Sequence, residues 1–433
     1  MANFRSNVFW RLDRLKGSPI RKHYDEVKFI IENPGSQKAE DIRGKHLQGL
    51  LQHATLNVEN YKSYNSKSLN DFPVINKSIV LNNFDAFKSN SFEREKKFSI
   101  TTGGSTGIPF KLWHDHNKKD RNTADTILFS ELANYELGSQ LVYLKLWAKK
   151  HQKSAFTLFA QNVLPHDVMD VAPDHLDHLI KAIKNSNDTK TIMGYSSFLE
   201  QMNSYVENKS IDMTKTHVRS IISIAEALDE ESKKGLAKQF DTEVYSRYSN
   251  QENGILAQQT MHSPNSYILN DASFKIELLN PDNNNAAEEG SWGRIVITDL
   301  FNYVMPLIRY DTGDLGIVEK TSEGRLQMKN VLGRKFDMIY DTKGQLIIPH
   351  SFYQIFDYSE CKQFQFVQDD ATLYKFIING KPDATDEEGA RKHYRKLLGQ
   401  DAEINFEYVD EIPQLSSGKR QKVASNYKPK TTN

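Results

Sequence analysis

Between residues 190 and 249, short apolar runs alternate with segments of helical periodicity. The runs are KTIMGY (190–195), SIISIA (220–225) and EVYSRYS (243–249). This alternation predicts an α/β fold with a mainly parallel sheet and helices on its faces. Ligands of such sheets bind beyond the carboxyl ends of the strands, so the loops after these runs are the first places to expect a site. Those loops are 194–197, 225–228 and 249–254.

The rest of the chain divides by periodicity. Its 433 residues exceed the ~250–300 at which a single core stops growing. Helical patterns fill residues 1–70, turn-separated strand patterns at 274–300 indicate a β-rich subdomain, and a new pattern of strands and helices begins after Gly333. We therefore expect a large N-terminal domain (1–332, with 1–70 as a helical extension) and a small, mobile α+β domain (333–433).

Charge and cysteine content limit the kinds of partner. Lys+Arg and Asp+Glu both number 56, so the net charge is zero and no basic field favours nucleic acid. The single cysteine, Cys361, excludes an intramolecular disulfide and a cysteine-based metal cluster. A lone cysteine also fits a reducing compartment.

The apolar runs and the N-terminus bear on location. No apolar run approaches the ~18 residues of a transmembrane helix. The N-terminus is basic, but charges interrupt its apolar runs, so it is not a secretory signal. It is able to touch anionic lipid, although a helix packed on the body of the protein is the simpler interpretation. We expect a cytoplasmic protein whose helical N-terminus is suited to a homodimer.

Residues 101–110, TTGGSTGIPF, combine three glycines with several hydroxyl groups. Glycine lets backbone N–H groups turn inward, so such a loop suits a phosphate. The same residue types also make ordinary surface turns. The stretch alone leaves both interpretations open.

Two acidic positions follow. Glu252, in RYSNQENG (247–254), lies just past a strand, where a carboxylate is able to hold Mg²⁺ together with phosphate oxygens; the alternative is a solvated loop acid. Asp314, in IRYDTGDLG (308–316), lies in a predicted tight Thr-Gly-Asp turn, where a carboxylate suits the hydroxyls of a ribose; the alternative is a common turn aspartate.

Two basic positions complete the series. Arg334, in LGRKFD (332–337), lies at the expected domain junction, and its guanidinium fits phosphate or ribose oxygens; the alternative is a surface ion pair. Lys419, in LSSGKRQK (415–422), is able to neutralise a developing phosphate charge; the alternative is one more basic tail residue.

The joint order of these motifs resembles the adenylate-forming (acyl-CoA synthetase-like) superfamily over about residues 70–425. The resemblance is nearest to the phenylacetate–CoA ligase-like branch and, within it, to the CapK-like group of capsular polysaccharide biosynthesis. Further segments carry it: NDFPVINKSIV (70–80), GYSSFL (194–199) and EEGSWGRIVITDL (288–300).

The resemblance implies roles for individual residues. The β- and γ-phosphates of ATP would be wrapped by Thr102, Gly103, Gly104, Ser105, Thr106 and Gly107. The remaining nucleotide contacts would come from Ala225 and Glu226 beside the adenine, Tyr248 stacked on it, Ser249, Asn250, Asp314 on the ribose and Arg334 on the ribose or phosphate side. Lys419, Thr106 and the Mg²⁺ ligand Glu252 would be catalytic, and the acyl pocket would involve Tyr195, Ser196 and Ser223.

The resemblance also implies a reaction. A small-molecule carboxylic acid attacks ATP in the presence of Mg²⁺, which gives an acyl-adenylate and pyrophosphate, and the acyl group then passes to CoA. The alternative is transfer to an amine in surface polysaccharide or natural-product biosynthesis. Phe336 and the polar MIYDTKGQLIIP (338–349) depart from the CoA-ligase pattern and keep the amine alternative open. Phe110 and Ile224 also depart from motifs that usually carry Lys and Gly there.

Other interpretations have less support. A P-loop needs Gly-Lys-[Ser/Thr], but Ile108 follows Gly107. A non-catalytic nucleotide-binding relative is a further alternative, against which the complete set of motif residues argues. Five histidines show no metal-ligand spacing and are interpreted as polar or packing residues: His114, His116, His217, His262 and His350.

Overall fold

A computed structural model describes residues 2–64, 68–102, 110–147, 153–168, 170, 172–321, 325–334, 339–347, 349–361, 363–413 and 422–427. The chain forms two compact units. The first comprises Met1–Thr312 and Gly316–Val331, and the second Gly313–Leu315 and Leu332–Asn433. Each is described by itself.

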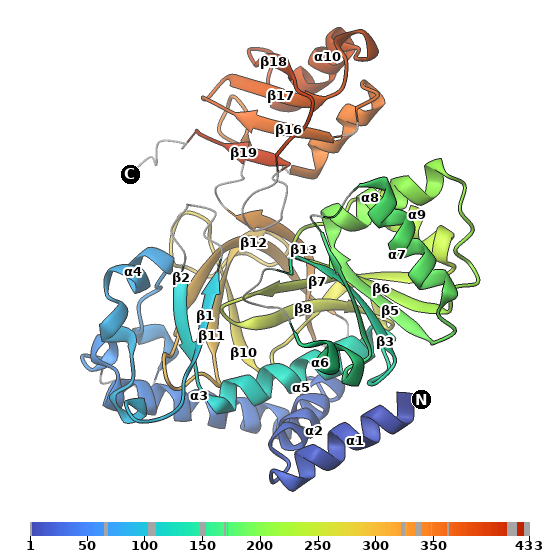
Figure 1. Ribbon diagram of the computed structural model, residues 1–433. Helices are drawn as coiled ribbons and strands as arrows, with labels where there is room; N and C mark the ends of the chain where they lie inside the picture. The colour runs from blue at the N-terminus through green and yellow to red at the C-terminus, as the bar shows by residue number, and fades with distance from the viewer. Residues whose placement is uncertain are drawn as a thin grey trace. The chain divides into compact units, whose positions relative to one another are not determined.

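The first unit is built on an eleven-stranded sheet, in the order β10-β11-β12-β13-β9-β8-β7-β6-β5-β3-β4 (Figure 1). Five strands at one end are parallel: β3 (Gln140–Lys145), β4 (Val163–Asp167), β5 (Lys190–Tyr195), β6 (Val218–Ile224) and β7 (Glu243–Asn250). Three helices share a buried core with these strands: α7 (Pro173–Asn185), α8 (Ser196–Asn208) and α9 (Glu230–Phe240). The predicted parallel sheet with covering helices is confirmed.

The predicted β-rich part continues this sheet. After the 251–253 turn the chain reverses, and β8 pairs antiparallel with β7, so the ladder is extended. The added strands are β8 (Gly254–Thr260), β9 (Ser263–Leu269), β10 (Phe274–Leu279), β11 (Trp292–Asp299), β12 (Tyr310–Lys320) and β13 (Leu326–Arg334).

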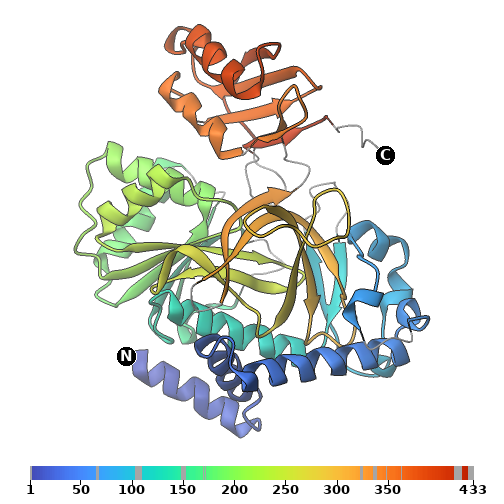
Figure 2. The ribbon, with the colours of Figure 1, turned by 180° about the vertical axis from the view of Figure 1, so that it is seen from behind.

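Helices from residues 2–132 other than α4 (Lys77–Asn82) gather on one side of the sheet (Figures 1 and 2). α2 (Pro19–Glu32) buries one face in a core that also contains residues of α5 (His116–Leu132). α3 (Gln37–Asn57) contributes Leu50 and Leu51 to a core around Val304 and Tyr310. The remaining elements are α1 (Ala2–Leu15), α4 (Lys77–Asn82), α6 (Ala155–Ala160) and the hairpin of β1 (Phe98–Thr102) with β2 (Phe110–His114).

The second unit is a small α+β fold, as the sequence predicts. Its four-stranded sheet has the order β18-β17-β16-β19. The strands are β16 (Gln363–Gln368), β17 (Leu373–Asn379), β18 (Glu403–Tyr408) and β19 (Val423–Ser425), with the helix α10 (Glu387–Leu398) and the short pair β14 (Ile339–Tyr340) and β15 (Leu346–Ile347). Stacked rings of Phe352 and Phe366, with centroids 3.8 Å apart, lie in its core.

Across the described residues of both units, no helix combines the length and apolar character needed to cross a membrane.

Candidate functional site

Several predicted site residues lie where the structure describes little. Gly103, Gly104, Ser105, Thr106, Gly107 and Lys419 lie outside the described residues. Thr102 is the last residue of β1, and it pairs with Phe110, the first residue of β2. The hairpin therefore brackets the expected phosphate loop. Arg334 ends β13.

The loops after β5 and β6 are joined by hydrogen bonds. The Ser196 Oγ lies 2.6 Å from the Ser223 Oγ and donates to the Glu226 carbonyl at 2.7 Å. The Glu226 carboxylate accepts from the backbone N–H of Ser197 at 3.1 Å, at the start of α8. Its other oxygen, Oε1, is buried and has no hydrogen-bond partner among the described residues. One oxygen of this carboxylate thus caps a helix, and the second is able to accept a hydrogen bond from a ligand.

Ser196 and Ser223 differ from Tyr195 in exposure. Both serines are fully buried (0% and 1% exposed), and their hydroxyls bond to each other. Tyr195 is half-buried, and burial raises its pKa to about 12. We interpret the serines as support behind the expected acyl pocket, and Tyr195 as the member of the three that is able to reach a ligand.

Ala225 holds an unusual backbone conformation at the end of β6. Its φ is +76°, in the left-handed region that a residue with a Cβ rarely adopts. Such conformations persist where the surroundings impose them, and they concentrate at functional sites. Glycine, which has no Cβ, is the residue that adopts this φ without a clash.

β7 and β12 meet although three strands lie between them in the sheet order. The Tyr248 hydroxyl donates to the Thr312 Oγ1 at 3.4 Å, and Thr312 in turn donates to the Ile295 carbonyl at 2.9 Å. The sheet is therefore strongly curved, which brings the strand that bears the adenine motif to the strand that bears the ribose motif.

The prediction of a tight turn at Thr-Gly-Asp is wrong. Asp314 lies inside β12, and Gly313 has a φ of +80° within that strand. The preceding residues pair with the segment around Ile75: its N–H donates to the Arg309 carbonyl (3.0 Å), and its carbonyl accepts from Asp311 N (2.7 Å). Pairing on both sides of β12 outweighs the turn tendency of a Thr-Gly-Asp sequence.

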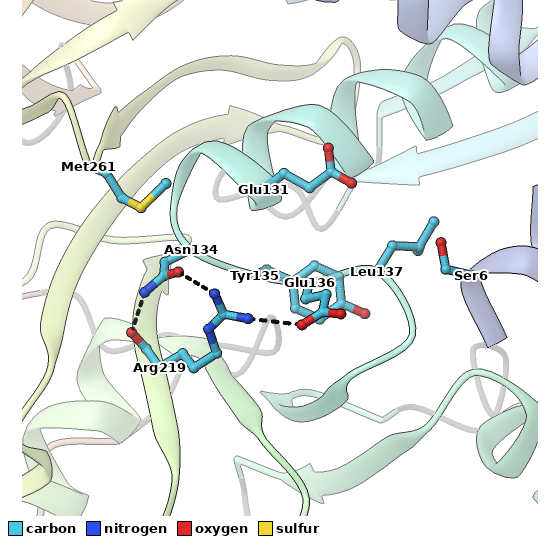
Figure 3. A pocket seen from close by; sticks show the side chains of 8 residues that line it. All are labelled: Ser6, Glu131, Asn134, Tyr135, Glu136, Leu137, Arg219 and Met261. Atoms are coloured by element: carbon cyan, nitrogen blue, oxygen red, sulfur yellow. Dashed lines mark hydrogen bonds and ion pairs between the residues drawn. The ribbon is translucent and has the colours of Figure 1, made fainter. Parts of the chain in front are cut away.

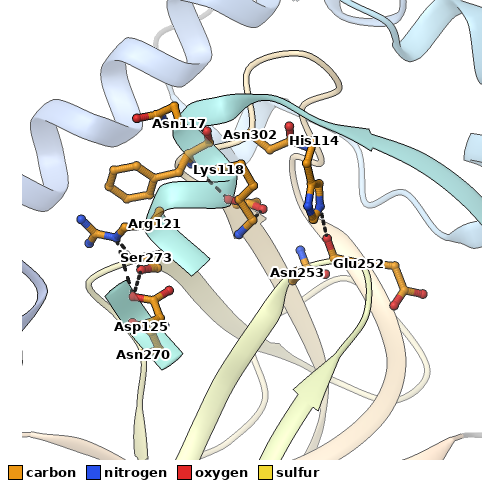
Figure 4. Close-up of polar contacts among 12 residues, drawn as sticks. His114, Asn117, Lys118, Arg121, Asp125, Glu252, Asn253, Asn270, Ser273 and Asn302 are labelled. Carbon is orange, nitrogen blue, oxygen red and sulfur yellow. Dashed lines mark hydrogen bonds and ion pairs between the residues drawn. The ribbon is translucent and has the colours of Figure 1, made fainter. Parts of the chain in front are cut away.

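Glu252 lies in the turn between β7 and β8, and His114 holds the backbone of that turn. The His114 Nε2 lies 2.8 Å from the Glu252 carbonyl oxygen and donates to it (Figure 4). Burial lowers the pKa of His114 to about 4, helped by the positive charge of Lys118, so the ring is neutral at pH 7. Figure 4 shows the Glu252 carboxylate directed away from His114.

The same turn is fixed at two further points. Asn250 Oδ1 accepts from the Asn253 N–H at 2.8 Å. Gly254 has a φ of +109°, and a Cβ placed there would lie 2.9 Å from Asn122 Oδ1 of α5. α5 and the end of β2 therefore determine where Glu252 stands.

Sequence reasoning missed the buried charges of α5. Lys118 and Arg121 are fully buried; Lys118 pairs with Asp299 at 2.7 Å, and Arg121 pairs with Glu26 at 2.7 Å. Ser273 accepts from Arg121 Nε at 2.8 Å and donates to Asp125 at 2.9 Å (Figure 4). The charged residues at positions 118, 121 and 125 share one helical face, but a solvated face has the same pattern, so the sequence carried no signal of their burial.

The described side chains could hold Mg²⁺ only if phosphate oxygens of a bound substrate also coordinate it. Within the described ranges, no group of three or more His, Cys, Asp or Glu side chains is arranged to hold a metal ion. Glu252, 9% exposed at a strand end, offers one carboxylate. Mg²⁺ is commonly held by one or two carboxylates plus substrate phosphates, so Glu252 fits that role.

A cavity of about 350 Å³ lies elsewhere, where β3 and β6 begin. Figure 3 shows Arg219 between Asn134 and Glu136, with N–O distances of 2.9 Å to each. Glu131, also in its wall, accepts from the Tyr24 hydroxyl at 2.6 Å. Because these polar groups already bond to other residues and lie at the opposite ends of the strands, we assign the cavity no part in the site.

Residues 339–426 match the family described as CapK C-terminal domain. The chain is 20% identical over 451 residues to Protein CapK of Staphylococcus aureus, covering 99% of this chain and 96% of that protein. It is 23% identical over 337 residues to a phenylacetate-coenzyme A ligase of Aromatoleum evansii, covering 76% and 70%. A crystal structure of 2-hydroxyisobutyryl-CoA ligase in the postadenylation state, bound to R3-HIB-AMP, aligns with a TM-score of 0.70 at 14% identity, covering 92% and 91%.

These similarities define the class first: the fold is that of the adenylate-forming ligases. Within that class, the chain is similar to the CapK-like group: its C-terminal part matches the CapK C-terminal family, and Protein CapK aligns with almost the whole chain.

Proposed function

We propose that the chain is a Mg²⁺- and ATP-dependent ligase that activates a carboxylic acid as an acyl-adenylate. The observation that supports this most is that separate sequence motifs meet at one place. The loops after β5, β6 and β7 lie at the carboxyl edge of parallel strands, and Tyr248 joins β7 to Thr312 on the strand of the ribose motif. A relative named as a CoA ligase and a neighbour bound to an acyl-AMP agree with this activity.

In the proposed reaction, positive charges and hydrogen-bond donors of the protein offset the repulsion between two anionic reactants. The carboxylate of the acid attacks the α-phosphorus of ATP, the bond to the β-phosphate oxygen breaks, and pyrophosphate leaves. Both reactants are anionic, so cations and N–H donors must oppose their repulsion. The amides and hydroxyls of residues 102–107 would wrap the triphosphate, Asp314 and Arg334 would hold the ribose side, and Lys419 would bridge the carboxylate and the α-phosphate. Mg²⁺ held at Glu252 would supply further positive charge to the phosphates.

Placement of Lys419 in the smaller domain suits a reaction in two steps. In our proposal the 333–433 domain brings Lys419 in for adenylation and withdraws it to admit the acceptor. The leading acceptor is CoA, whose thiolate attacks the acyl carbon and releases AMP. We propose that this occurs in the cytoplasm, where ATP and CoA are available.

An amine is the second candidate acceptor. The segment after Arg334, which is an apolar strand in CoA ligases of this branch, is here interrupted by a polar turn. Asp341 Oδ1 accepts from the N–H groups of Lys343 (2.9 Å) and Gln345 (2.7 Å), between β14 and β15. This departure favours an acceptor other than the pantetheine arm of CoA.

ATP–pyrophosphate exchange with a panel of aromatic, aliphatic and sugar-derived acids tests the adenylation step. Exchange that depends on one class of acid and on Mg²⁺ is the expected result. Absence of exchange with every acid, from a chain that is folded, would contradict the proposal. AMP release on addition of CoA or of amines then distinguishes the two acceptors.

Lys419→Ala tests the mechanism. Exchange should fall by about 10²-fold or more, since one group that stabilises transition-state charge is removed, while ATP binding measured by calorimetry is retained. Lys422→Ala is the matched control and should exchange normally. A Lys419→Ala variant with normal exchange contradicts the role of Lys419 but leaves adenylation itself intact.

A further inference from the structure

α1 is held against the protein by one of its faces. Trp10 is partly buried, and its ring meets that of Tyr24 on α2 with centroids 5.5 Å apart. Asp13 is buried, 4% exposed, and accepts from the backbone N–H groups of Ile20 (3.1 Å) and Arg21 (3.0 Å). These contacts fix the rotation of α1 about its own axis, so its opposite face cannot turn inward.

That opposite face carries an exposed apolar stripe. Its members are Phe4 (71% exposed), Val8 (38%), Leu12 (54%) and Leu15 (84%). Successive members are four, four and three residues apart, and a helix turns about 100° per residue, so they lie in one sector of the helix. Surface helices normally direct such a stripe to the core, and a contiguous exposed apolar face marks an interaction site.

α6 extends the stripe. Phe156 and Phe159 are 79% and 73% exposed, and the guanidinium of Arg5 on α1 lies over the Phe159 ring, 5.7 Å from its centroid. The two helices are therefore neighbours. We call the following side chains the outer apolar patch: Phe4, Val8, Leu12, Leu15, Phe156 and Phe159.

The charge that α1 itself carries is positive. By helical geometry Arg11 and Arg14 flank the stripe on one side and Arg5 on the other, and Lys16 follows the helix directly. Asp13, the acidic residue of this segment, is buried. The chain as a whole has a net charge of zero, so the basic excess is local. Long cationic side chains beside an apolar stripe are able to reach lipid headgroups while the apolar residues enter the acyl boundary.

We propose that the outer apolar patch docks on the surface of an anionic lipid bilayer, with α1 lying in the plane of the interface. Charge decides between this partner and a second copy of the chain. In a twofold interface the same patch faces itself, which would bring the arginines of both copies together. Anionic headgroups complement these arginines, and the acyl region accommodates the phenylalanines and leucines.

Cosedimentation of the full chain with vesicles tests the proposal. Vesicles of phosphatidylcholine with roughly a third phosphatidylglycerol should bind the chain at least about tenfold more tightly than pure phosphatidylcholine. Added salt should weaken the binding, because part of the attraction is between exposed charges.

Two variants separate the apolar and the charged contributions. Leu12→Ser/Leu15→Ser and Arg11→Glu/Arg14→Glu should each weaken binding to the anionic vesicles by about tenfold or more. Leu56→Ser is the matched control, because Leu56 is 65% exposed on α3 but lies outside the patch, and it should bind like the unchanged chain. Thermal unfolding checks that each variant is folded.

Three results would overturn the proposal: no binding of the unchanged chain to anionic vesicles, equal binding by Leu12→Ser/Leu15→Ser, or a dimer in solution that this variant disrupts without any vesicle binding. The last would assign the patch to contact between copies.

Discussion

Two polar regions of the large unit differ in how the protein uses them. Beneath α5, Lys118 and Asp299 are buried almost completely and face each other as opposite charges. At the ends of β6 and β7, Ala225 carries a strained backbone, Glu226 keeps one carboxylate oxygen without a described partner, and Glu252 stands in a turn fixed through its carbonyl. Charge density alone therefore does not mark a site: balanced buried charge holds elements in place, whereas backbone strain and carboxylates at strand ends occur where a ligand is expected.

The largest expected effect is on stability, and it concerns the α5 region. Lys118→Met leaves the buried Asp299 carboxylate without its counterion, which should cost ~3–5 kcal/mol of unfolding free energy. Urea denaturation measures the loss. Lys119→Met changes an exposed neighbour and should cost much less. Equal losses in the two variants would show that the buried pair has no special structural role.

Glu252→Gln should lower activity rather than stability, the opposite of what is expected for Lys118→Met. Its rate of ATP–pyrophosphate exchange should fall by about 10²-fold, since the proposed Mg²⁺ carboxylate is lost, while the unfolding free energy changes by less than about 1 kcal/mol. Glu230→Gln, at an exposed position in α9, is the control for charge. A Glu252 variant that is unstable but fully active would reverse the distinction between the two regions.

Acid should destabilise the α5 region through groups beside Arg121. Burial lowers the pKa of His23 from 6.5 to about 4, with the Arg121 charge adding to the effect. Burial alone would raise the pKa of Glu26, but His46 and Arg121 outweigh it and lower this pKa to about 2.

Both depressed pKa values mean that the unfolded chain binds protons more readily. The stability due to His23 is therefore complete above pH 6.5 and is lost as the pH falls toward about 4; that due to Glu26 is lost between about 4.5 and 2. The slope is at most about 1.4 kcal/mol per pH unit for each proton. Urea denaturation at a series of pH values measures how the unfolding free energy depends on pH. His23→Asn should reduce this dependence between about pH 6.5 and 4. An unchanged slope in that range would exclude His23 as its source.

The smallest expected effect tests the strain at the strand ends. Ala225→Gly should raise the unfolding free energy by less than about 1 kcal/mol, because glycine adopts a φ of +76° without a Cβ clash. Ala227→Gly, whose φ is not positive, should instead lower it slightly. Thermal unfolding of both variants gives the signs, and the same sign in both would mean that Ala225 is not strained.

Much of the parallel sheet could be predicted from the sequence, because its strands are continuous apolar runs. KTIMGY coincides with β5, SIISIA falls on β6 and the residue after it, and EVYSRYS falls within β7. The order of these strands fixed which loops share an edge. The link between Ser196 and Glu226 then follows from the parallel pairing of β5 with β6.

Three other features could not be predicted, because they depend on contacts between residues that are far apart in the sequence. The charges at 118, 121 and 125 have the pattern of a solvated helix face, and only partners such as Glu26 and Asp299 bury them. The Thr-Gly-Asp motif has turn composition, and only its neighbours in the sheet make it a strand. His114 had no sequence signal for its bond to the Glu252 carbonyl, because nothing local relates the two positions.

The pairing of Ile75 with Arg309 and Asp311 also determines when the N-terminal region is able to fold during translation. The two partners are separated by roughly 230 residues, which a ribosome adds in about 10 to 50 s. Until then, apolar side chains of α3 such as Leu50 lack the partners that Val304 and Tyr310 provide. The N-terminal helices of the nascent chain therefore keep apolar surface exposed for that time, which raises the risk of aggregation during translation.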